Sequence, residues 1–289
     1  MQVSGSHIGI IGGSGLYEFE ALEINQTLDI ETPFGKPSAP LVGGTLAGRQ
    51  VWFLARHGKG HTILPTELNH KANIWALKSV GVDWIISVTA VGSLRDDYAP
   101  RDMVIPHQLI DHTSRREHAT FFGGGIVAHP SLAHPYAEDL RQILIKACEQ
   151  TSTTHHAQGI YINMDGPAFS TQAESQLYRQ WGCDIIGMTN ATEAKLAREA
   201  EIAFATLSMV TDYDCWHPEH DNVEVEMIIG HLMANAAKSQ ELLQAIIPMI
   251  PSEADYPEHK SLEFAIITAK DIWPKTTVKK LEPILRRFL

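Results

Sequence analysis

Two carboxylates, Asp212 and Asp214, follow the apolar run of residues 203–210. A carboxylic acid beside an apolar wall has a raised pKa and can donate a proton, so the pair suits acid catalysis. A metal site is a weaker interpretation, because no third carboxylate or histidine follows at a compelling fixed spacing. The structural alternative is a turn that leads into a helix cap.

Groups suited to an anion lie after two other predicted strands. The turn at 12–15, Gly-Gly-Ser-Gly, offers backbone N–H groups and the Ser14 hydroxyl. A dinucleotide fingerprint would need glycine at position 18, which is Glu18, and the lysine-containing phosphate loop is absent. Arg56 adds a permanent forked charge, and His57 can donate a hydrogen bond from a ring nitrogen. A plain turn and a surface ion pair are the structural alternatives.

Small or hydroxyl-bearing residues follow two more strands, at Thr89–Ala90 and at Met188–Thr189. Threonine at such a place is often a helix cap, and methionine is often core. Phe169 and Ser170 follow a Gly-Pro turn, where the ring either stacks on a planar ligand or fills the core. Together these strand ends favour a ligand site, because ligands bind at the carboxyl ends of strands in open α/β sheets.

The elements that must position these residues alternate between strands and helices. Their pattern predicts an α/β fold: a single domain with a central mixed, largely parallel twisted sheet flanked by helices. A helix from Thr66 to about Val80 is expected to end at Gly81. Strands are expected at 7–11, 50–55, 84–89, 103–110, 159–164, 184–188 and 202–210. Further helices are expected at 136–150, 172–181, 192–200 and 223–246.

Two parts of the chain differ in character. Residues 1–250 are expected to form the catalytic domain. Residues 251–289 are expected to be a C-terminal extension packed on the same domain or on a neighbouring subunit, because their apolar side chains fit docking better than disorder. Those side chains are Ile272, Trp273, Val278, Leu281, Ile284, Leu285 and Leu289.

Composition excludes several classes of function. The 289 residues include 23 Lys and Arg against 34 Asp and Glu, a net charge of -11, which argues against nucleic-acid and membrane-surface binding. No apolar run reaches the length of a transmembrane helix, and no leader pattern is present, so a cytoplasmic location is expected. Cys148, Cys183 and Cys215 lack a spacing for disulfides or zinc. No metal site is predicted.

Several motifs occur in a fixed order along residues 7 to about 250. They are Gly12-Gly13-Ser14-Gly15, Thr32-Pro33-Phe34-Gly35-Lys36-Pro37-Ser38, Ala55-Arg56-His57-Gly58, Asn73-Ile74-Trp75-Ala76-Leu77-Lys78, Gly92-Ser93-Leu94-Arg95 and Thr211-Asp212-Tyr213-Asp214-Cys215-Trp216. In this order they closely resemble the trimeric purine nucleoside phosphorylase family, and within it the branch that acts on 5'-methylthioadenosine.

The resemblance implies a phosphate-dependent cleavage. Phosphate attacks the anomeric carbon of 5'-deoxy-5'-methylthioadenosine, giving adenine and 5-methylthioribose 1-phosphate, as in purine and methionine salvage. It implies no cofactor, since inorganic phosphate is a co-substrate. The protein would bind a nucleoside and phosphate, and neither nucleic acid nor a membrane. It would assemble as a homotrimer or as a dimer of trimers.

The resemblance also assigns roles to residues. The phosphate site would comprise Ser14 with the amides of 12–15, Arg56, His57, Thr89, Ala90 and Thr189. Met188 would contact the ribose, and Phe169 with Ser170 would hold the base. Asp212, Tyr213 and Asp214 would line the purine, with Asp212 and Asp214 catalytic. Val225, Ile228 and Ile229 would form the wall for the 5' group, with His129 contributed across a subunit interface. Ser170 and Val225 would set specificity.

Asp212 bears on the choice of base. A carboxylate accepts from a 6-amino group but opposes a 6-oxo group unless it is protonated, and an unmatched buried polar group costs about 1–3 kcal/mol, so adenine is favoured. The chain departs from the family pattern at Ala168, Gly187 and Thr192. A methylthioinosine phosphorylase or a broad-specificity purine nucleoside phosphorylase is therefore an alternative. A nucleotide-binding oxidoreductase or a non-catalytic binding module on the same fold are alternatives from other classes.

Overall fold

The structure is a computed structural model that describes residues 7–13, 19, 21–114, 116–217 and 225–289. Eleven strands of this described part form one sheet. They are β1 (His7–Gly12), β2 (Glu23–Leu28), β3 (Leu41–Leu46), β4 (Arg49–Ala55), β5 (Val82–Ser93), β6 (Met103–Val104), β7 (Gln108–Asp111), β8 (His155–His156), β9 (Ile160–Asn163), β10 (Ile185–Gly187) and β11 (Ala203–Asp212).

The sheet is mixed and largely parallel, as predicted. Its main order is β2-β3-β4-β1-β5-β10-β9-β7, and a branch leads from β5 through β11 and β6 to β8. Strands β4, β1, β5 and β11 run parallel to one another, and so do β10, β9 and β7. The two parallel groups meet where β10 pairs antiparallel with the end of β5.

Strand β5 has an opening along one of its edges. On one side β11 pairs with it from Trp84 to Gly92. On the other side β1 pairs with β5 as far as Val88, and β10 begins only at Gly92. Within the described chain, residues 89–91 therefore have no strand partner on that side. Backbone N–H and C=O groups left unpaired at such a place are available to a ligand. We call this opening the β5 notch.

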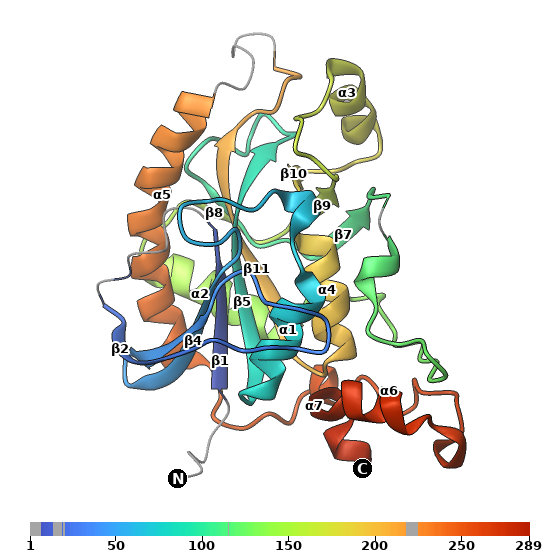
Figure 1. Ribbon diagram of the computed structural model, residues 1–289. Helices are drawn as coiled ribbons and strands as arrows, with labels where there is room; N and C mark the ends of the chain where they lie inside the picture. The colour runs from blue at the N-terminus through green and yellow to red at the C-terminus, as the bar shows by residue number, and fades with distance from the viewer. Residues whose placement is uncertain (1–6, 14–18, 20, 115, 218–224) are drawn as a thin grey trace.

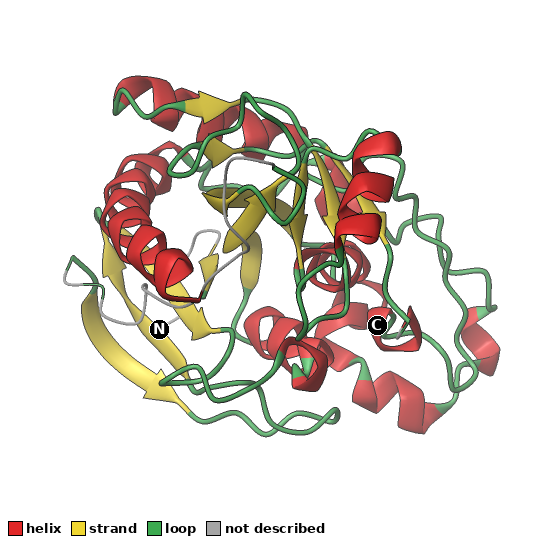
Figure 2. Cartoon of the chain, turned by 90° about the horizontal axis from the view of Figure 1, so that it is seen from above, coloured by secondary structure: helices red, strands yellow, loops and turns green. Residues whose placement is uncertain are grey.

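Helices cover both faces of the sheet (Figures 1 and 2). Helices α2 (Glu138–Gln150) and α5 (Val225–Ile246) lie on one face, and α1 (His70–Ser79) and α4 (Asn190–Glu199) on the other, while α3 (Gln172–Gln180) lies near β10. Successive residues of β5 enter opposite cores: Ile85 packs with the α1–α4 side and Ile86 with the α2–α5 side. Burial on both faces explains the nearly continuous apolar strands of the sequence.

Two predicted elements differ from the structure. The helix expected from Thr66 begins at His70, and its cap is Asn69, whose side chain accepts the Ala72 N–H at 3.1 Å. The strand expected at 103–110 is two strands, β6 and β7, with Pro106 between them, because proline has no N–H for a sheet ladder. Gly81 does adopt the left-handed conformation expected at a helix end, with φ +83°.

The other predicted elements match observed ones, with ends that differ by one or two residues or, for β5, with a longer strand. The sequence prediction did not include β2, β3 or β8. In the part of the chain that the structure describes, no helix is long and apolar enough to span a membrane.

The C-terminal extension contains the short helices α6 (Lys275–Lys280) and α7 (Glu282–Leu285), seen in red in Figure 1. Leu281 and Ile284 are buried in the same core as α1. The extension also pairs with the segment before α2: Ala128 forms a β-bridge with Ile266. Phe264 remains almost fully exposed. The expected boundary at residue 250 stays a prediction.

Candidate active site

The β5 notch lies beside the carboxyl ends of three other strands. Gly12 ends β1, Arg56 follows β4, Thr89 and Ala90 lie in β5, and Thr189 follows β10. Arg56 ties the ends of β1 and β5 together: its backbone N–H donates to Gly12 at 2.9 Å, and its Nη1 donates to the carbonyl of Val88 at 2.9 Å. The structure thus places most of the predicted phosphate residues around one opening.

Arg56 is not an isolated cation. Its side chain is buried with 1% exposure, and its Nε donates to Glu193 Oε1 at 2.5 Å. Ser87 completes a closed set by accepting from Nη2 at 2.7 Å and donating to Glu193 Oε2 at 2.8 Å. Burial raises the pKa of Glu193, but the charge and hydrogen bond of Arg56 outweigh it and hold the pKa below its ordinary value. Sequence reasoning missed Glu193, which is 137 residues from Arg56.

His57 is neutral at physiological pH. Burial lowers its pKa to about 4, helped by the charge of Arg56. Its Nδ1 lies 2.9 Å from the carbonyl of Ile63, which can only accept, so Nδ1 carries the ring proton. The other nitrogen, Nε2, is then an acceptor. The expectation that His57 offers a donor to an anion therefore changes: in its neutral form Nε2 accepts a hydrogen bond.

Thr189 marks the start of α4. It occupies the cap position, but its hydroxyl makes no cap bond and, within the described residues, has no hydrogen-bond partner. The Ala191 N–H is taken by Asn163 Oδ1 at 2.9 Å. Since the positive end of a helix dipole favours anions, the start of α4 and the buried Thr189 hydroxyl are both suited to a phosphate. Met188, the residue before, packs against Gly166.

Asp212 ends β11 and lies against β5. Its Oδ1 is 2.9 Å from the position of a Cβ at Gly92, so only glycine leaves room there. Oδ2 accepts from the Thr211 hydroxyl at 2.7 Å, and Oδ1 accepts from the Asp214 N–H at 2.8 Å. Burial raises the pKa of Asp212 to about 6 despite these bonds, and the charge of Asp214 adds to the rise. Such a group is a proton donor near neutral pH.

Asp214 is buried beside it, with a left-handed φ of 51°. Burial raises its pKa as well, while Ser175 and Ser170 act in the opposite direction. The thiol of Cys215 donates to the Ser170 carbonyl at 3.2 Å, which ties this turn to the Ser170 segment. Asp212, Asp214 and Ser170 are therefore brought together, as predicted for a purine site.

The aromatic residues of this region differ in their placement. Phe169 is 47% exposed, so its ring does not fill the core and is available for stacking. Tyr213 turns toward a neighbouring loop: its hydroxyl donates to the Asp96 carbonyl at 3.5 Å, and its ring contacts Trp216.

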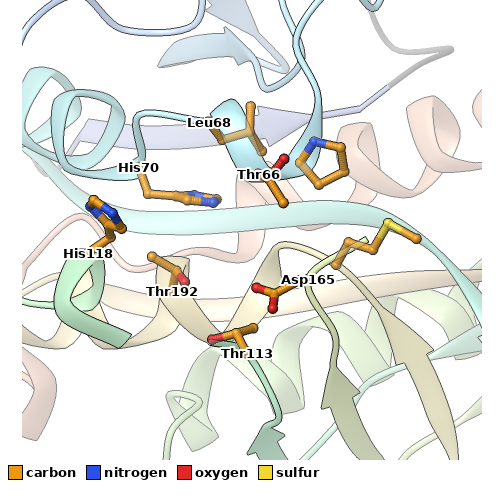
Figure 3. A pocket seen from close by; sticks show the side chains of 9 residues that line it. Thr66, Leu68, His70, Thr113, His118, Asp165 and Thr192 are labelled. Carbon is orange, nitrogen blue, oxygen red and sulfur yellow. The ribbon is translucent and has the colours of Figure 1, made fainter. Parts of the chain in front are cut away.

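A pocket opens next to Met188 and the start of α4. Figure 3 shows His70 and His118 at one end of it and Asp165 with Thr113 at the other. His70 is buried, its Nδ1 lies 4.0 Å from Glu193 Oε1, and burial lowers its pKa to about 4. The pocket is lined by Pro65, Thr66, Leu68, His70, Thr113, His118, Asp165, Met188 and Thr192.

Some predicted residues do not join this arrangement. Ser14 and the side chains of Val225, Ile228 and Ile229 lie outside what the structure describes. His129 is described, and its N–H donates to Ala265 of the C-terminal extension at 2.9 Å. Among the described residues, no three His, Cys, Asp or Glu side chains are grouped to hold a metal ion.

Residues 7–248 match a family model described as the phosphorylase superfamily. The chain belongs to this superfamily. The resemblance to nucleoside phosphorylases that the motifs carry is therefore confirmed. The match spans β1 to the end of α5, so the notch, the Asp212 turn and the pocket of this phosphorylase all lie within it.

Relatives of this phosphorylase cover nearly all of its chain. An S-methyl-5'-thioadenosine phosphorylase from Synechocystis sp. is 50% identical over 97% of this chain and 87% of its own. An S-methyl-5'-thioadenosine phosphorylase from Koribacter versatilis is 49% identical over 98% of this chain and 97% of its own. A methylthioadenosine phosphorylase structure sourced from an antarctic soil metagenomic library is 46% identical over 98% and 99%, with a TM-score of 0.92. Another, from Schistosoma mansoni in complex with adenine, is 35% identical over 92% and 99%, with a TM-score of 0.86.

Proposed function

We propose that this phosphorylase cleaves 5'-deoxy-5'-methylthioadenosine with inorganic phosphate, giving adenine and 5-methylthioribose 1-phosphate. One observation carries the proposal. The unpaired edge of β5 at Thr89–Ala90 and the contact of Gly92 with the carboxyl of Asp212 lie on the same strand. This supports an anion site near one end of the strand segment and a proton donor near the other, the arrangement that a displacement at the anomeric carbon requires.

Phosphate would bind in the β5 notch. The backbone N–H that β5 leaves unpaired in the notch, the hydroxyls of Thr89 and Thr189, and the start of α4 supply neutral donors. Arg56 supplies the positive charge. Its Nη1 carries two N–H groups and makes one hydrogen bond within the described chain, so one N–H remains for the anion. The position of a Cβ at Gly13 is 3.5 Å from this Nη1, so the guanidinium lies against Gly13. His57 Nε2 would accept from a phosphate O–H.

The purine would lie between Phe169 and the Asp212 turn. The positive charge that develops on the sugar is stabilised by the adjacent phosphate, and the charge that develops on the leaving base needs a proton donor. Asp212, with a pKa of about 6, supplies it at N7 of the base, and its other oxygen accepts from the 6-amino group. Asp214 and Ser170 complete the polar edge, and Met188 lies beside the ribose.

The test is a product assay with and without phosphate. Adenine that appears from methylthioadenosine only when phosphate is present supports the proposal. Adenine that appears without phosphate, or no adenine at all, would overturn it. Adenosine run in parallel measures how strictly the enzyme requires a methylthio group at the 5' position.

A methylthioinosine phosphorylase is the second candidate, and the raised pKa of Asp212 is the observation that favours it. A protonated carboxyl can donate to a 6-oxo group, which the ionised form would repel. Methylthioinosine and inosine in the same assay decide between them. A kcat/KM for methylthioinosine above that for methylthioadenosine would make the 6-oxopurine the substrate.

A homotrimer, alone or as two stacked trimers, is the assembly we propose. The segment of His129 is held by the C-terminal extension, and the exposed apolar residues Phe264, Ile267 and Ile272 lie on that same extension. Exposed apolar side chains grouped in this way suit a subunit contact. Sedimentation of the wild-type chain and of Phe264→Asp tests it, because the variant should dissociate. The cytoplasmic location stays a prediction, and the three cysteines are free thiols in the structure.

A further inference from the structure

Tyr161 on β9 is fully buried, yet its hydroxyl has no partner at hydrogen-bonding geometry within the described residues. Its ring packs in a small apolar cluster with Val91, Ile185 and Val210. A buried hydroxyl without a partner is costly and rare in native proteins. A phenylalanine ring would fill the same apolar cluster, so packing does not explain why this position carries a hydroxyl.

Gly187 makes room for this hydroxyl. The parallel pairing of β9 and β10 places Tyr161 beside Ile185, and the ring extends along β10 to Gly187. A Cβ at position 187 would stand 1.9 Å from the phenolic oxygen and 2.7 Å from the ring carbon that bears it. Any residue other than glycine would therefore displace the phenol from its present place.

The hydroxyl reaches the β5 notch. The Thr89 side chain and the backbone of Thr189 are the polar groups that act on it, although neither is in hydrogen-bonding geometry. Burial nevertheless raises the pKa of Tyr161 well above its ordinary value, so the phenol stays protonated. Thr89 itself donates only to its neighbour's carbonyl, Ala90 O, at 3.3 Å. The Thr189 hydroxyl has no partner in the described chain.

Three buried hydroxyls are therefore incompletely satisfied at one place, beside unpaired backbone of β5. Tyr161 is the most completely buried of them, and Thr89 is part of the notch itself. A hydroxyl that receives a hydrogen bond on its oxygen can point its own proton elsewhere, so a phenol behind a threonine can fix the direction of the threonine O–H.

We infer that Tyr161 is a positioning residue for phosphate: when phosphate occupies the notch, the Tyr161 O–H donates to Thr89 Oγ1, and the Thr89 hydroxyl turns its proton from the Ala90 carbonyl toward a phosphate oxygen. Thr189 is the second hydroxyl donor to the same anion. Gly187 is the residue that permits this arrangement. The inference rests on the proposed function, because it assigns the anion of the notch to the phosphate co-substrate.

The test compares Tyr161→Phe with Tyr98→Phe. Tyr98 belongs to the same apolar cluster, and its hydroxyl donates to the Gln158 carbonyl at 2.9 Å, outside the site. Loss of one neutral hydrogen bond predicts a KM for phosphate about threefold to tenfold higher in Tyr161→Phe. The KM for the nucleoside and kcat at saturating phosphate should change less than about twofold, and Tyr98→Phe should leave all three near wild type.

Two further variants keep the result decisive. In a Thr89→Val background, Tyr161→Phe should add little to the KM for phosphate, because both changes remove one chain of hydrogen bonds. If Tyr161→Phe does not fold, Gly187→Ala provides the second route, since its Cβ displaces the phenol and should raise the same KM. Additive effects in the double variant, or an unchanged KM for phosphate in Tyr161→Phe or Gly187→Ala, would overturn the inference.

Failure of the proposed function gives a different result. If the wild-type chain shows no phosphate-dependent release of a purine from any of the nucleosides, the function is wrong, and the assignment of the notch to phosphate fails with it. If the wild-type chain is active and only the predicted change in KM is missing, the function stands and Tyr161 has a structural role alone.

Discussion

The proposed phosphate end and the proposed purine end of the site differ in whether a buried charge has a counter-charge beside it. At the phosphate end, Arg56 and Glu193 are both buried and pair directly, with Ser87 closing the set. At the purine end, the carboxyls of Asp212 and Asp214 lie close together, and the groups that bond to them in the described chain are neutral. One end compensates its buried charge, and the other leaves it uncompensated.

The paired charges contribute mainly to stability, whereas the unpaired carboxyls are suited to proton transfer. A compensated pair keeps its charges at every physiological pH and holds three strand ends in place. An uncompensated carboxyl rises in pKa and becomes able to give up a proton near neutral pH. We therefore expect changes to the charged pair at the phosphate end to act mainly on folding, and changes to the carboxyls at the purine end to act mainly on turnover.

The largest effect should come from Glu193→Gln. It leaves the Arg56 charge buried without its counter-charge, which costs about 3–5 kcal/mol of unfolding free energy. Urea unfolding measures it, and Glu241→Gln, which breaks the exposed pair with Lys238, should cost below about 1 kcal/mol. Added phosphate should stabilise Glu193→Gln more than wild type, because the anion replaces the missing charge. Equal losses in both variants would contradict the contrast between the two ends.

The next effect is on the choice of base. Asp212→Asn removes the proton donor and turns one acceptor into a donor. We expect kcat/KM for methylthioadenosine to fall about 5- to 150-fold, as an unmatched group worth about 1–3 kcal/mol implies, and the value for methylthioinosine to fall far less. Steady-state kinetics on both substrates measure this, with Asp255→Asn on the surface as control. Equal losses on both bases would remove Asp212 from base recognition.

The same residue should make stability depend on pH. The pKa of Asp212 is about 6 in the folded chain against an ordinary 3.8, so between these values the folded state holds a proton that the unfolded chain has released. Stability contributed by this group is present below pH 4 and is lost as pH rises through about 6. Asp212→Asn lacks this loss. Urea unfolding at several pH values should therefore show the variant gaining on wild type from pH 4 to 7, and a constant difference would refute the raised pKa.

The smallest effect should come from the segment that carries Phe169. Thr171 caps α3 through its bond to the Glu174 N–H, and Glu174 bonds back to it. Thr171→Ala should lower stability by about 1 kcal/mol and raise the nucleoside KM less than about threefold. The KM for phosphate should not move. Thermal unfolding and the two KM values test this, and a shift in the phosphate KM would show that the two ends are coupled.

Local signals in the sequence predicted most elements, and they singled out strand-end residues that the structure brings around the β5 notch. Apolar runs predict β1, β5 and β11, since buried parallel strands need them. The prediction missed β2, which is mostly exposed and has no apolar run. It misplaced the start of α1, because Thr66 and Asn69 are both good caps and only the three-dimensional structure shows that the Pro65 turn comes first.

Contacts between residues far apart in the chain could not be predicted from the sequence. Nothing near Glu193 indicates that it pairs with Arg56, and nothing near Tyr161 indicates that it reaches Thr89. The glycine at 187 was visible as a departure from the family pattern, and the available signal was its combination with a tyrosine on the neighbouring strand. The structure gives the reason, which is the space that the phenol occupies.

Strand β5 also fixes the distance between the two ends of the proposed site. Gly92 is the third residue after Thr89, which gives a span of about 10 Å in an extended strand. In the proposed reaction one end of that span faces the phosphate, and the other end touches Asp212. The distance between the two would then be set by covalent geometry within a buried strand. A loop could drift with temperature, whereas this spacing is held by β11 along its whole length. Inserting a single residue there would reverse the side chains beyond it and leave both partners of the reaction misaligned.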